Sequence, residues 1–280
     1  MSFYTPFAFY QAGGVAPSFD PDAQAYIDEV IAAGGTLSAG DQTAINGLYV
    51  SLKANSLYSE ILYMYPFMGE SADASAIDGI NPTDADYTVS WSGILTNDAN
   101  HTSAGINTTG GDGWGTINKS ASTIHSSVDS VTLGASITSA TTNNQSFVIG
   151  PVGPLTTSNR YQFNIPFDSN NVYIVSGVVS SLAVYNNGSS PIGRWIGSRI
   201  SSTSIVLYKD GSSVNSSTVS NSGGTLNTNL IQFFTTDSST GAIGPFNGVC
   251  GFLFGANGLD NTQVSTLDGI LSTFLTAIGR

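Results

Sequence analysis

The sequence predicts a mainly β fold, a sandwich or jelly roll of short strands with a few helices before it and one helix after it. From Tyr87 onward, apolar residues alternate with polar ones, which is the period of a strand that buries one face. Clusters of Gly, Asn and Ser separate these runs, as turns do between antiparallel strands. Apolar residues recur at helical spacing before residue 69 and again after residue 259.

Residues 1–20 are expected to form an N-terminal anchor arm. Two alternatives explain this stretch: an edge strand that folds back onto the core of its own chain, or an arm that inserts its side chains into a partner. Aromatic side chains dominate interface energetics, so we assign the binding role to the arm. Five aromatic residues fall within the first ten positions: Phe3, Tyr4, Phe7, Phe9 and Tyr10.

Residues 21–69 are expected to form a cap of three short helices. Asp20 is placed to cap the first helix, and Ser38 and Asp41 have the spacing of a capping box for the second. The third helix is predicted around SLYSEILYMY and ends before the proline that follows. The apolar stripes of these helices predict core contacts rather than ligand sites.

Residues 70–280 are expected to form the sandwich itself, with roughly ten short strands. Alternation is clearest in YTVSWSG, SVTLGASIT and RYQFNIPF. In SIVLYKDGSSV, the dipeptide Asp210-Gly211 predicts a two-residue type I′ hairpin turn, because both central positions of that turn need φ > 0. A capped amphipathic helix over residues 260–279 closes the chain. We find no fixed-period repeat, which disfavours a propeller or solenoid.

The charge balance restricts the expected partners. Charged residues make up 9% of the chain, against about 25% in a typical soluble domain. The net charge is −12, and residues 1–86 hold eleven acidic residues and one basic residue. A chain this acidic is repelled by phosphate backbones, so nucleic acid is not an expected partner. The first basic residue is Lys53, and no 18-residue apolar run occurs, so neither a secretory signal nor membrane insertion is expected.

Few residues are suited to catalysis. The single cysteine, Cys250, alternates with phenylalanines in GVCGFLFG and is expected to be a small buried hydrophobe. A catalytic triad needs a base beside a serine, and His101 and His125 are the two histidines that could supply one. Neither lies in a recognisable motif. No spacing matches a metal or phosphate site, so we expect no cofactor and no metal.

Sugar cleavage needs a separate test, because sandwich folds host both lectins and glycosidases. A glycosidase requires two carboxyl groups about 5–10 Å apart. All three glutamates, Glu29, Glu60 and Glu70, lie in the helical region or its exit. The aspartates of the predicted sandwich fall mainly in turns. The sequence therefore predicts a protein that is not an enzyme.

Aromatic and polar turn residues provide the candidates for glycan binding. Trp91 and Trp195 are expected in the core. Trp114 lies in the glycine-dense segment GINTTGGDGWG, where it could either fill the core or stack on a sugar. Together with Tyr185 and Asn187 of the turn YNNGSS, Trp114 forms the predicted glycan-binding set.

Three passages resemble a group of bacteriophage virion proteins that carry a concanavalin A-like, laminin-G-like jelly roll. One is the helical opening that runs into YPFMG. Another is NPTDADYTVSWSG followed by NHTSAGINTTGGDGWGTI. The last pairs the hairpin SRISSTSIVLYKDGSSV with the closing FLFGANGLDNTQVSTLDGILSTFLTAIGR. Together they cover most of residues 20–280, and their order carries the resemblance more than any single motif does.

The resemblance implies a non-enzymatic virion protein, made in the cytoplasm of the host bacterium. Its N-terminal region would dock onto other virion proteins, and its sandwich would be displayed on a tail fibre or tail tip to attach to host-surface glycans. A capsid decoration or head-fibre protein is the alternative; a free carbohydrate-binding module or glycan depolymerase is the second. A homo-oligomer is expected, because an aromatic arm is costly to leave in water.

Overall fold

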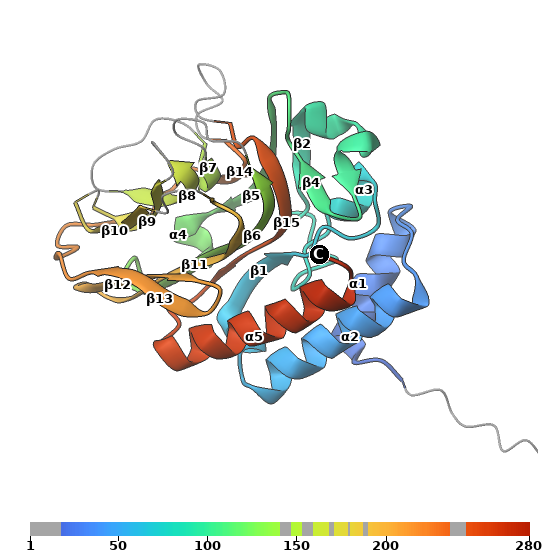
Figure 1. Cartoon of the computed structure of the whole chain (residues 1–280), viewed down its shortest axis with the longest axis horizontal. Helices are drawn as coiled ribbons and strands as arrows, with labels where there is room; N and C mark the ends of the chain where they lie inside the picture. The colour runs from blue at the N-terminus through green and yellow to red at the C-terminus, as the bar shows by residue number, and fades with distance from the viewer. Residues whose placement is uncertain are drawn as a thin grey trace, which may run out of the picture.

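The structure is a computed structural model of the whole chain. It describes residues 18–140, 147–152, 159–167, 171–178, 180–186, 190–235 and 245–280. Two antiparallel sheets face one another, and three long helices lie against one of them (Figure 1). The predicted mainly β sandwich, with helices before it and a helix after it, is confirmed.

The long helices begin where the sequence predicted. They are α1 (Pro21–Ala32), α2 (Ala39–Ala54) and α5 (Asn261–Ala277). The Asp20 carboxylate accepts hydrogen bonds from the first turn of α1. Capping boxes begin the other two, formed by Ser38 with Asp41 and by Asp260 with Gln263. These caps satisfy backbone N–H groups that have no partner inside the helix.

The shorter helices are η1 (Tyr58–Glu60), α3 (Ala72–Ser75), η2 (Ile94–Thr96), η3 (Asp98–Asn100) and α4 (Ala121–Ile124). The eight-stranded sheet runs in the order β13-β12-β11-β6-β15-β4-β3, and β1 also pairs with β15. Its strands are β1 (Ile61–Tyr65), β3 (His101–Thr102), β4 (Gly105–Asn107), β6 (Val131–Ala140), β11 (Gly193–Ser201), β12 (Ser204–Lys209), β13 (Ser212–Ser217) and β15 (Gly248–Ala256).

The seven-stranded sheet runs in the order β10-β9-β8-β7-β14-β5-β2. Its strands are β2 (Ser90–Gly93), β5 (Gly113–Ser120), β7 (Phe147–Pro151), β8 (Arg160–Phe167), β9 (Asn171–Gly177), β10 (Leu182–Asn186) and β14 (Leu230–Phe233). Every strand pair in both sheets is antiparallel among the residues that the structure describes.

The prediction of a third helix around SLYSEILYMY was wrong. After the short η1, this segment forms β1, which pairs with β15 in the eight-stranded sheet. Tyr63 and Tyr65 enter the core between the sheets, whereas Ile61 and Met64 pack towards the helices. Apolar residues on both faces mimic a helical stripe, and pairing with β15 decides the outcome. The boundary between cap and sandwich at residue 69 stays a prediction. However, β1 belongs to the expected cap by sequence and to the sandwich by its pairing with β15.

Two apolar clusters divide the molecule into layers. One lies between the two sheets and holds the inward side chains of both. The other lies between the eight-stranded sheet and the helices, where Phe252 of β15 packs against Phe274 of α5 with ring centroids 6.0 Å apart. The middle of the eight-stranded sheet is therefore buried on both faces, and the outer face of the seven-stranded sheet lies on the side away from α1, α2 and α5 (Figure 1).

Local predictions about turns and core residues are also confirmed. Asp210 and Gly211 have φ values of 48° and 76° and join β12 to β13, as a type I′ turn requires. Trp195 and Cys250 are fully buried, and Trp91 is half-buried at the edge of the core. The alternating residues of β6 and of residues 161–165 point into the core, while the side chain of Phe167 lies outside the described residues.

Candidate functional site

A row of amide side chains crosses the outer face of the seven-stranded sheet. Gln162 and Asn164 come from β8, and Gln232 comes from β14. Their neighbours along each strand, such as Phe163 and Phe233, belong to the core between the sheets. Because side chains alternate across a strand, the three amides must point away from that core.

These amides are shielded from solvent and lack hydrogen-bond partners. All three residues have 0% exposed surface. Five of their six polar side-chain atoms have no partner: Nε2 of Gln162, Oδ1 and Nδ2 of Asn164, and Oε1 and Nε2 of Gln232. Oε1 of Gln162 accepts a hydrogen bond of 3.1 Å from Arg160. Each unpaired buried group costs about 1–3 kcal/mol, so a cluster of five requires an explanation.

Aromatic and hydroxyl side chains flank the amides on the same sheet face. Thr116 of β5 lies directly opposite Gln232, and Trp114 is two residues along that strand. Tyr173 of β9 lies opposite Asn164. We call these three residues, together with Gln162, Asn164 and Gln232, the amide face. Four strand steps separate β5 from β9, which gives the row a length of about 19 Å.

Exposure along the amide face is greatest at β5. Trp114 and Thr116 are half-buried, whereas the amides and Tyr173 are buried. Gly150 of β7 lies opposite Gln232 and brings no side chain to the middle of the row. A glycine at such a position allows another group to approach the backbone closely.

The six residues of the amide face suit hydroxyl recognition. A hydroxyl group both donates and accepts hydrogen bonds, and so does an amide through its NH₂ and carbonyl groups. An indole ring adds an apolar surface with a polar N–H at its edge. No carboxylate, imidazole or thiol occurs among these six residues, so the face lacks the pair of carboxyl groups that glycoside hydrolysis usually requires.

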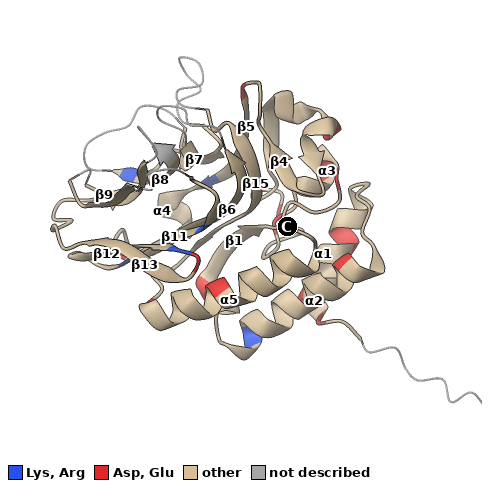
Figure 2. Cartoon of the chain, viewed as in Figure 1, with Lys and Arg blue, Asp and Glu red and all other residues tan. Residues whose placement is uncertain are grey.

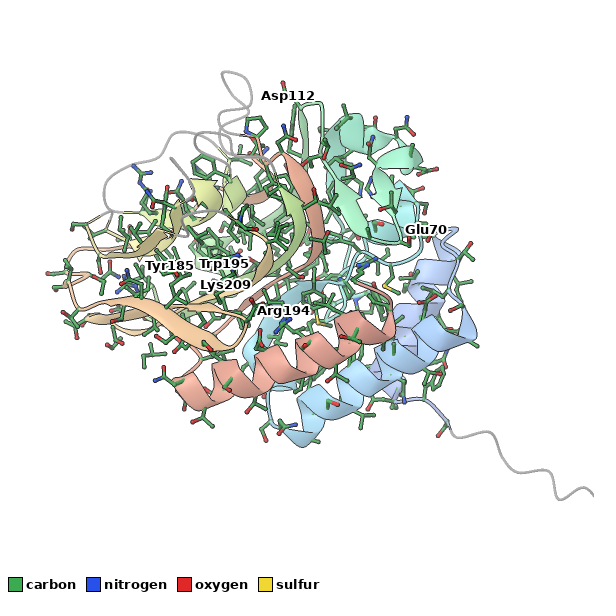
Figure 3. The ribbon with its side chains drawn as sticks, in the orientation of Figure 1. Glu70, Asp112, Tyr185, Arg194, Trp195 and Lys209 are labelled. Carbon is green, nitrogen blue, oxygen red and sulfur yellow. The ribbon has the colours of Figure 1, made fainter. Side chains whose placement is uncertain are left out.

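The structure separates the predicted glycan-binding residues. Trp114 belongs to the amide face, but Tyr185 lies on β10, five strand steps or about 24 Å away. The Tyr185 ring packs against Trp195 with centroids 6.0 Å apart, and Nζ of Lys209 lies 5.0 Å from the Trp195 ring (Figure 3). Tyr185 thus helps to close the core at its end of the sandwich. Asn187 lies outside the described residues, as do Phe3, Tyr4, Phe7, Phe9 and Tyr10.

The three amides were missed because nothing in the sequence distinguishes them. In RYQFNIPF and LIQFF, each amide occupies the polar position of an alternating strand, where any solvent-facing residue would serve equally well. Their burial, and the convergence of β8 and β14 on one face with β7 between them, depend on strand order. The one feature that the sequence offered is that the polar position holds an amide at these three places, where serine or a charged residue is also common on an exposed strand face.

Both histidines are buried, and each uses Nε2 in a hydrogen bond while its Nδ1 has no partner. Nε2 of His125 pairs with the Tyr161 hydroxyl at 3.0 Å, and that hydroxyl pairs with the Tyr63 hydroxyl at 2.9 Å. Burial lowers the pKa of His125 to about 4. Nε2 of His101 pairs with the Leu95 carbonyl at 2.8 Å, and burial lowers its pKa as well. Within the described part of the chain, neither ring pairs with a serine hydroxyl.

Most acidic residues lie away from the amide face, although the guanidinium of Arg160 contacts Gln162. Acidic positions gather around α1, α2 and α3, and much of the sandwich is uncharged (Figure 2). Asp84 and Asp86 pair with Lys119 at 3.7 and 3.0 Å. No cluster of three or more metal-ligating side chains occurs among the described residues. None of the helices in that part of the chain has the length and apolarity needed to cross a membrane.

Comparisons with known proteins give similarities of structure alone. No protein-family model matches the sequence, and no curated protein matches it either. Domain 4 of AbnA, a GH43 extracellular arabinanase from Geobacillus stearothermophilus solved with arabinotriose, is 15% identical with a TM-score of 0.46, and the match covers 74% of this chain and 98% of that domain.

Two larger proteins match over part of their length. The binding domain of botulinum neurotoxin serotype D is 12% identical with a TM-score of 0.47, over 77% of this chain and 53% of that one. A leech intramolecular trans-sialidase is 12% identical with a TM-score of 0.39, over 51% of this chain and 24% of the leech enzyme. We draw no functional conclusion from likeness at this level.

Proposed function

We propose that the protein binds a carbohydrate at the amide face, without chemical conversion. The observation that carries this proposal is the set of five unpaired amide atoms at solvent-shielded positions of Gln162, Asn164 and Gln232. Sugar hydroxyl groups would supply the missing donors and acceptors, because each hydroxyl can do both. A ligand that pairs these groups recovers their desolvation cost on binding, which favours affinity for a polyhydroxylated molecule.

Trp114 would supply the apolar part of the recognition. The side chain of Trp114 is half-buried. It lies on the same sheet face as Gln232, which is its diagonal neighbour across the β5–β14 pair. Ligand sites commonly combine an aromatic surface with a few placed polar groups that fix orientation. The absence of a carboxylate among the six residues of the amide face favours binding over hydrolysis, which would need a pair of them.

Glycan binding is tested by replacing one unpaired amide. The intact protein is screened on immobilised bacterial cell-envelope polysaccharides and neutral oligosaccharides, and the best binder is titrated by calorimetry. Gln232→Leu should weaken binding roughly tenfold or more, because the partner hydroxyls lose both hydrogen bonds. The control Gln24→Leu places the same substitution on α1, away from the amide face, and should bind normally. Equal binding by both variants, or no binding by the unaltered protein, would refute the proposal.

We further propose that the sandwich is displayed on a bacteriophage virion. The passages that resemble phage virion proteins support this proposal, and residues 1–69 would make the contact with other virion proteins. A tail fibre or tail tip is the favoured location, with capsid decoration or a head fibre as the alternative. A free carbohydrate-binding module would need no particle at all.

The location is tested by immunogold labelling of purified particles with an antibody raised against the sandwich. Label at the tail tip or fibres supports host attachment, and label across the head supports decoration instead. Particles without label would refute virion display while leaving glycan binding untouched, because the calorimetric test does not depend on the particle.

A further inference from the structure

A groove runs between α2 and α5 on the outer surface of the helical layer. The two helices lie side by side (Figure 1), and the groove has a volume of about 790 Å³. Buried Leu48 and Phe274 form part of its floor. Small residues dominate its walls, with Gly40, Thr43, Gly47 and Ser51 on α2 and Thr266, Gly269, Thr273 and Ala277 on α5.

The groove is uncharged although the region around it is strongly acidic. None of its thirteen lining residues is Asp, Glu, Lys or Arg. Residues 1–86 nevertheless hold eleven acidic residues and one basic residue. A charged occupant would lose its hydration against such walls without gaining a partner. The groove therefore selects an apolar, uncharged segment.

Residues 1–17 of the chain have the matching composition. This segment, MSFYTPFAFYQAGGVAP, contains five aromatic residues and no Asp, Glu, Lys or Arg. Burying an aromatic side chain against apolar walls is favourable, and leaving five of them in water is costly. The groove and the segment are thus both uncharged, although acidic residues occur throughout residues 18–86.

The described chain begins beside α2, the helix that forms one wall of the groove. The backbone N–H of Asp20 donates to Oδ1 of Asn46 on α2 at 2.7 Å, and Nζ of Lys53 lies 2.6 Å from Oδ1 of Asp20. A helix is about 10–12 Å across. Seventeen residues can span up to about 55–60 Å, so the segment is long enough to cross α2 and enter the groove.

We propose that residues 1–17 dock in the groove between α2 and α5. The aromatic side chains fill the space that the small residues leave open, and the arm becomes part of the helical surface. This inference is independent of the proposed glycan binding, because no residue of the amide face lines the groove. Residues 1–17, docked between α2 and α5, would then form part of the surface that contacts other virion proteins.

Blocking the groove in the full-length chain tests the proposal. A Cβ atom added at Gly269 meets no atom within 4 Å, so this position accepts a side chain, and Gly269→Trp should fill the groove. The control Ala32→Trp puts the same side chain on exposed α1. Chymotrypsin cleavage among Phe3, Tyr4, Phe7, Phe9 and Tyr10 is followed by mass spectrometry. Gly269→Trp should be cleaved roughly tenfold faster than the unaltered chain, because cleavage tracks the undocked fraction.

Ala32→Trp should be cleaved at the unaltered rate. Equal rates in all three proteins would overturn the proposal. Circular dichroism establishes that both variants are folded, so that faster cleavage reports release of the arm rather than unfolding.

A cross-linking experiment identifies the chain that supplies the arm. Phe7→Cys is combined with Thr273→Cys in the groove, or with Ser213→Cys on exposed β13 as a control. Native Cys250 is fully buried and does not interfere. A short bis-maleimide should link the groove pair and not the control pair. A linked product of monomer mass places the arm in its own chain, and one of dimer mass places it in a neighbouring copy. No preference for the groove pair would refute docking.

Discussion

The outer faces of the two sheets differ in what surrounds their buried side chains. On the eight-stranded sheet, Phe252 and Phe254 are buried under α5 and α2 in a second apolar cluster. On the seven-stranded sheet, Gln162 and Gln232 occupy equally buried outward positions but carry unpaired amides. The first face is built for stability, since its aromatic side chains are buried against the helices. The second carries an energetic cost that a ligand could remove, which is a common property of functional sites.

The largest expected effect comes from truncating the apolar outer face. Phe254 is 1% exposed and packs against Phe252 with ring centroids 6.3 Å apart. Phe254→Ala should lower the free energy of unfolding by about 3–5 kcal/mol, because it leaves a cavity between the sheet and the helices. Urea denaturation measures the change. Gln162→Ala is the matched truncation on the other sheet, and an equally large loss there would contradict the comparison.

The pH dependence of the free energy of unfolding tests the contact between the two sheets. There, His125, Tyr161 of β8 and Tyr63 of β1 form a hydrogen-bonded chain. The folded pKa of His125 is about 4, against about 6.5 in an unfolded chain. The unfolded state therefore takes up a proton first as pH falls. The free energy of unfolding should drop by roughly 3 kcal/mol between about pH 6.5 and pH 4 and change no further below that range.

His125→Phe should remove this contribution, which is read as the difference between the unfolding curves of the two proteins at several pH values. The difference is needed because Asp78 acts in the opposite direction: burial raises its pKa to about 7, so its protonation stabilises the fold as pH falls. A difference independent of pH would show that His125 is not kept neutral in the fold.

An ion pair adds to the attachment of α5 to the eight-stranded sheet. Nε and Nη2 of Arg194 each lie 2.9 Å from a carboxylate oxygen of Asp268, whose side chain is 8% exposed. Asp268→Asn should cost about 2 kcal/mol, because charge-assisted bidentate pairs are the stronger ones. Asp210 also approaches Arg194, at 3.7 Å and with a side chain 47% exposed. Asp210→Asn should therefore cost less than about 1 kcal/mol. A loss larger than that of Asp268→Asn would show that Asp210, and not Asp268, is the main partner of Arg194.

The last expected effect has the opposite sign. Gln232→Leu removes two unpaired polar atoms from a buried position at similar volume, so it should raise the free energy of unfolding by about 1 kcal/mol. The same variant should lose glycan binding. Thermal denaturation together with calorimetric titration measures both. A stabilised variant with unchanged binding would leave the amide face as a strained but functionless surface.

The sequence determined the features that depend on a few neighbouring residues. Asp20, Ser38 and Asp260 fixed the starts of the three long helices, because their side chains pair with backbone N–H groups within the next few residues. Asp210-Gly211 fixed a hairpin for the same local reason. The alternation of apolar residues determined which side chains of β6 and β8 enter the core between the sheets.

The tertiary structure decided everything that depends on which strand lies beside which. Residues Ile61–Tyr65 have a helix-like apolar pattern and form a strand because β15 offers them backbone partners. Tyr185 is committed to the core by Trp195, which comes from the other sheet. Gln162 and Gln232 are 70 positions apart and share one face through the order of β8, β7 and β14. A side chain's hydrogen-bond partners and burial are set by these long-range neighbours, and the local pattern of a strand contains no record of them.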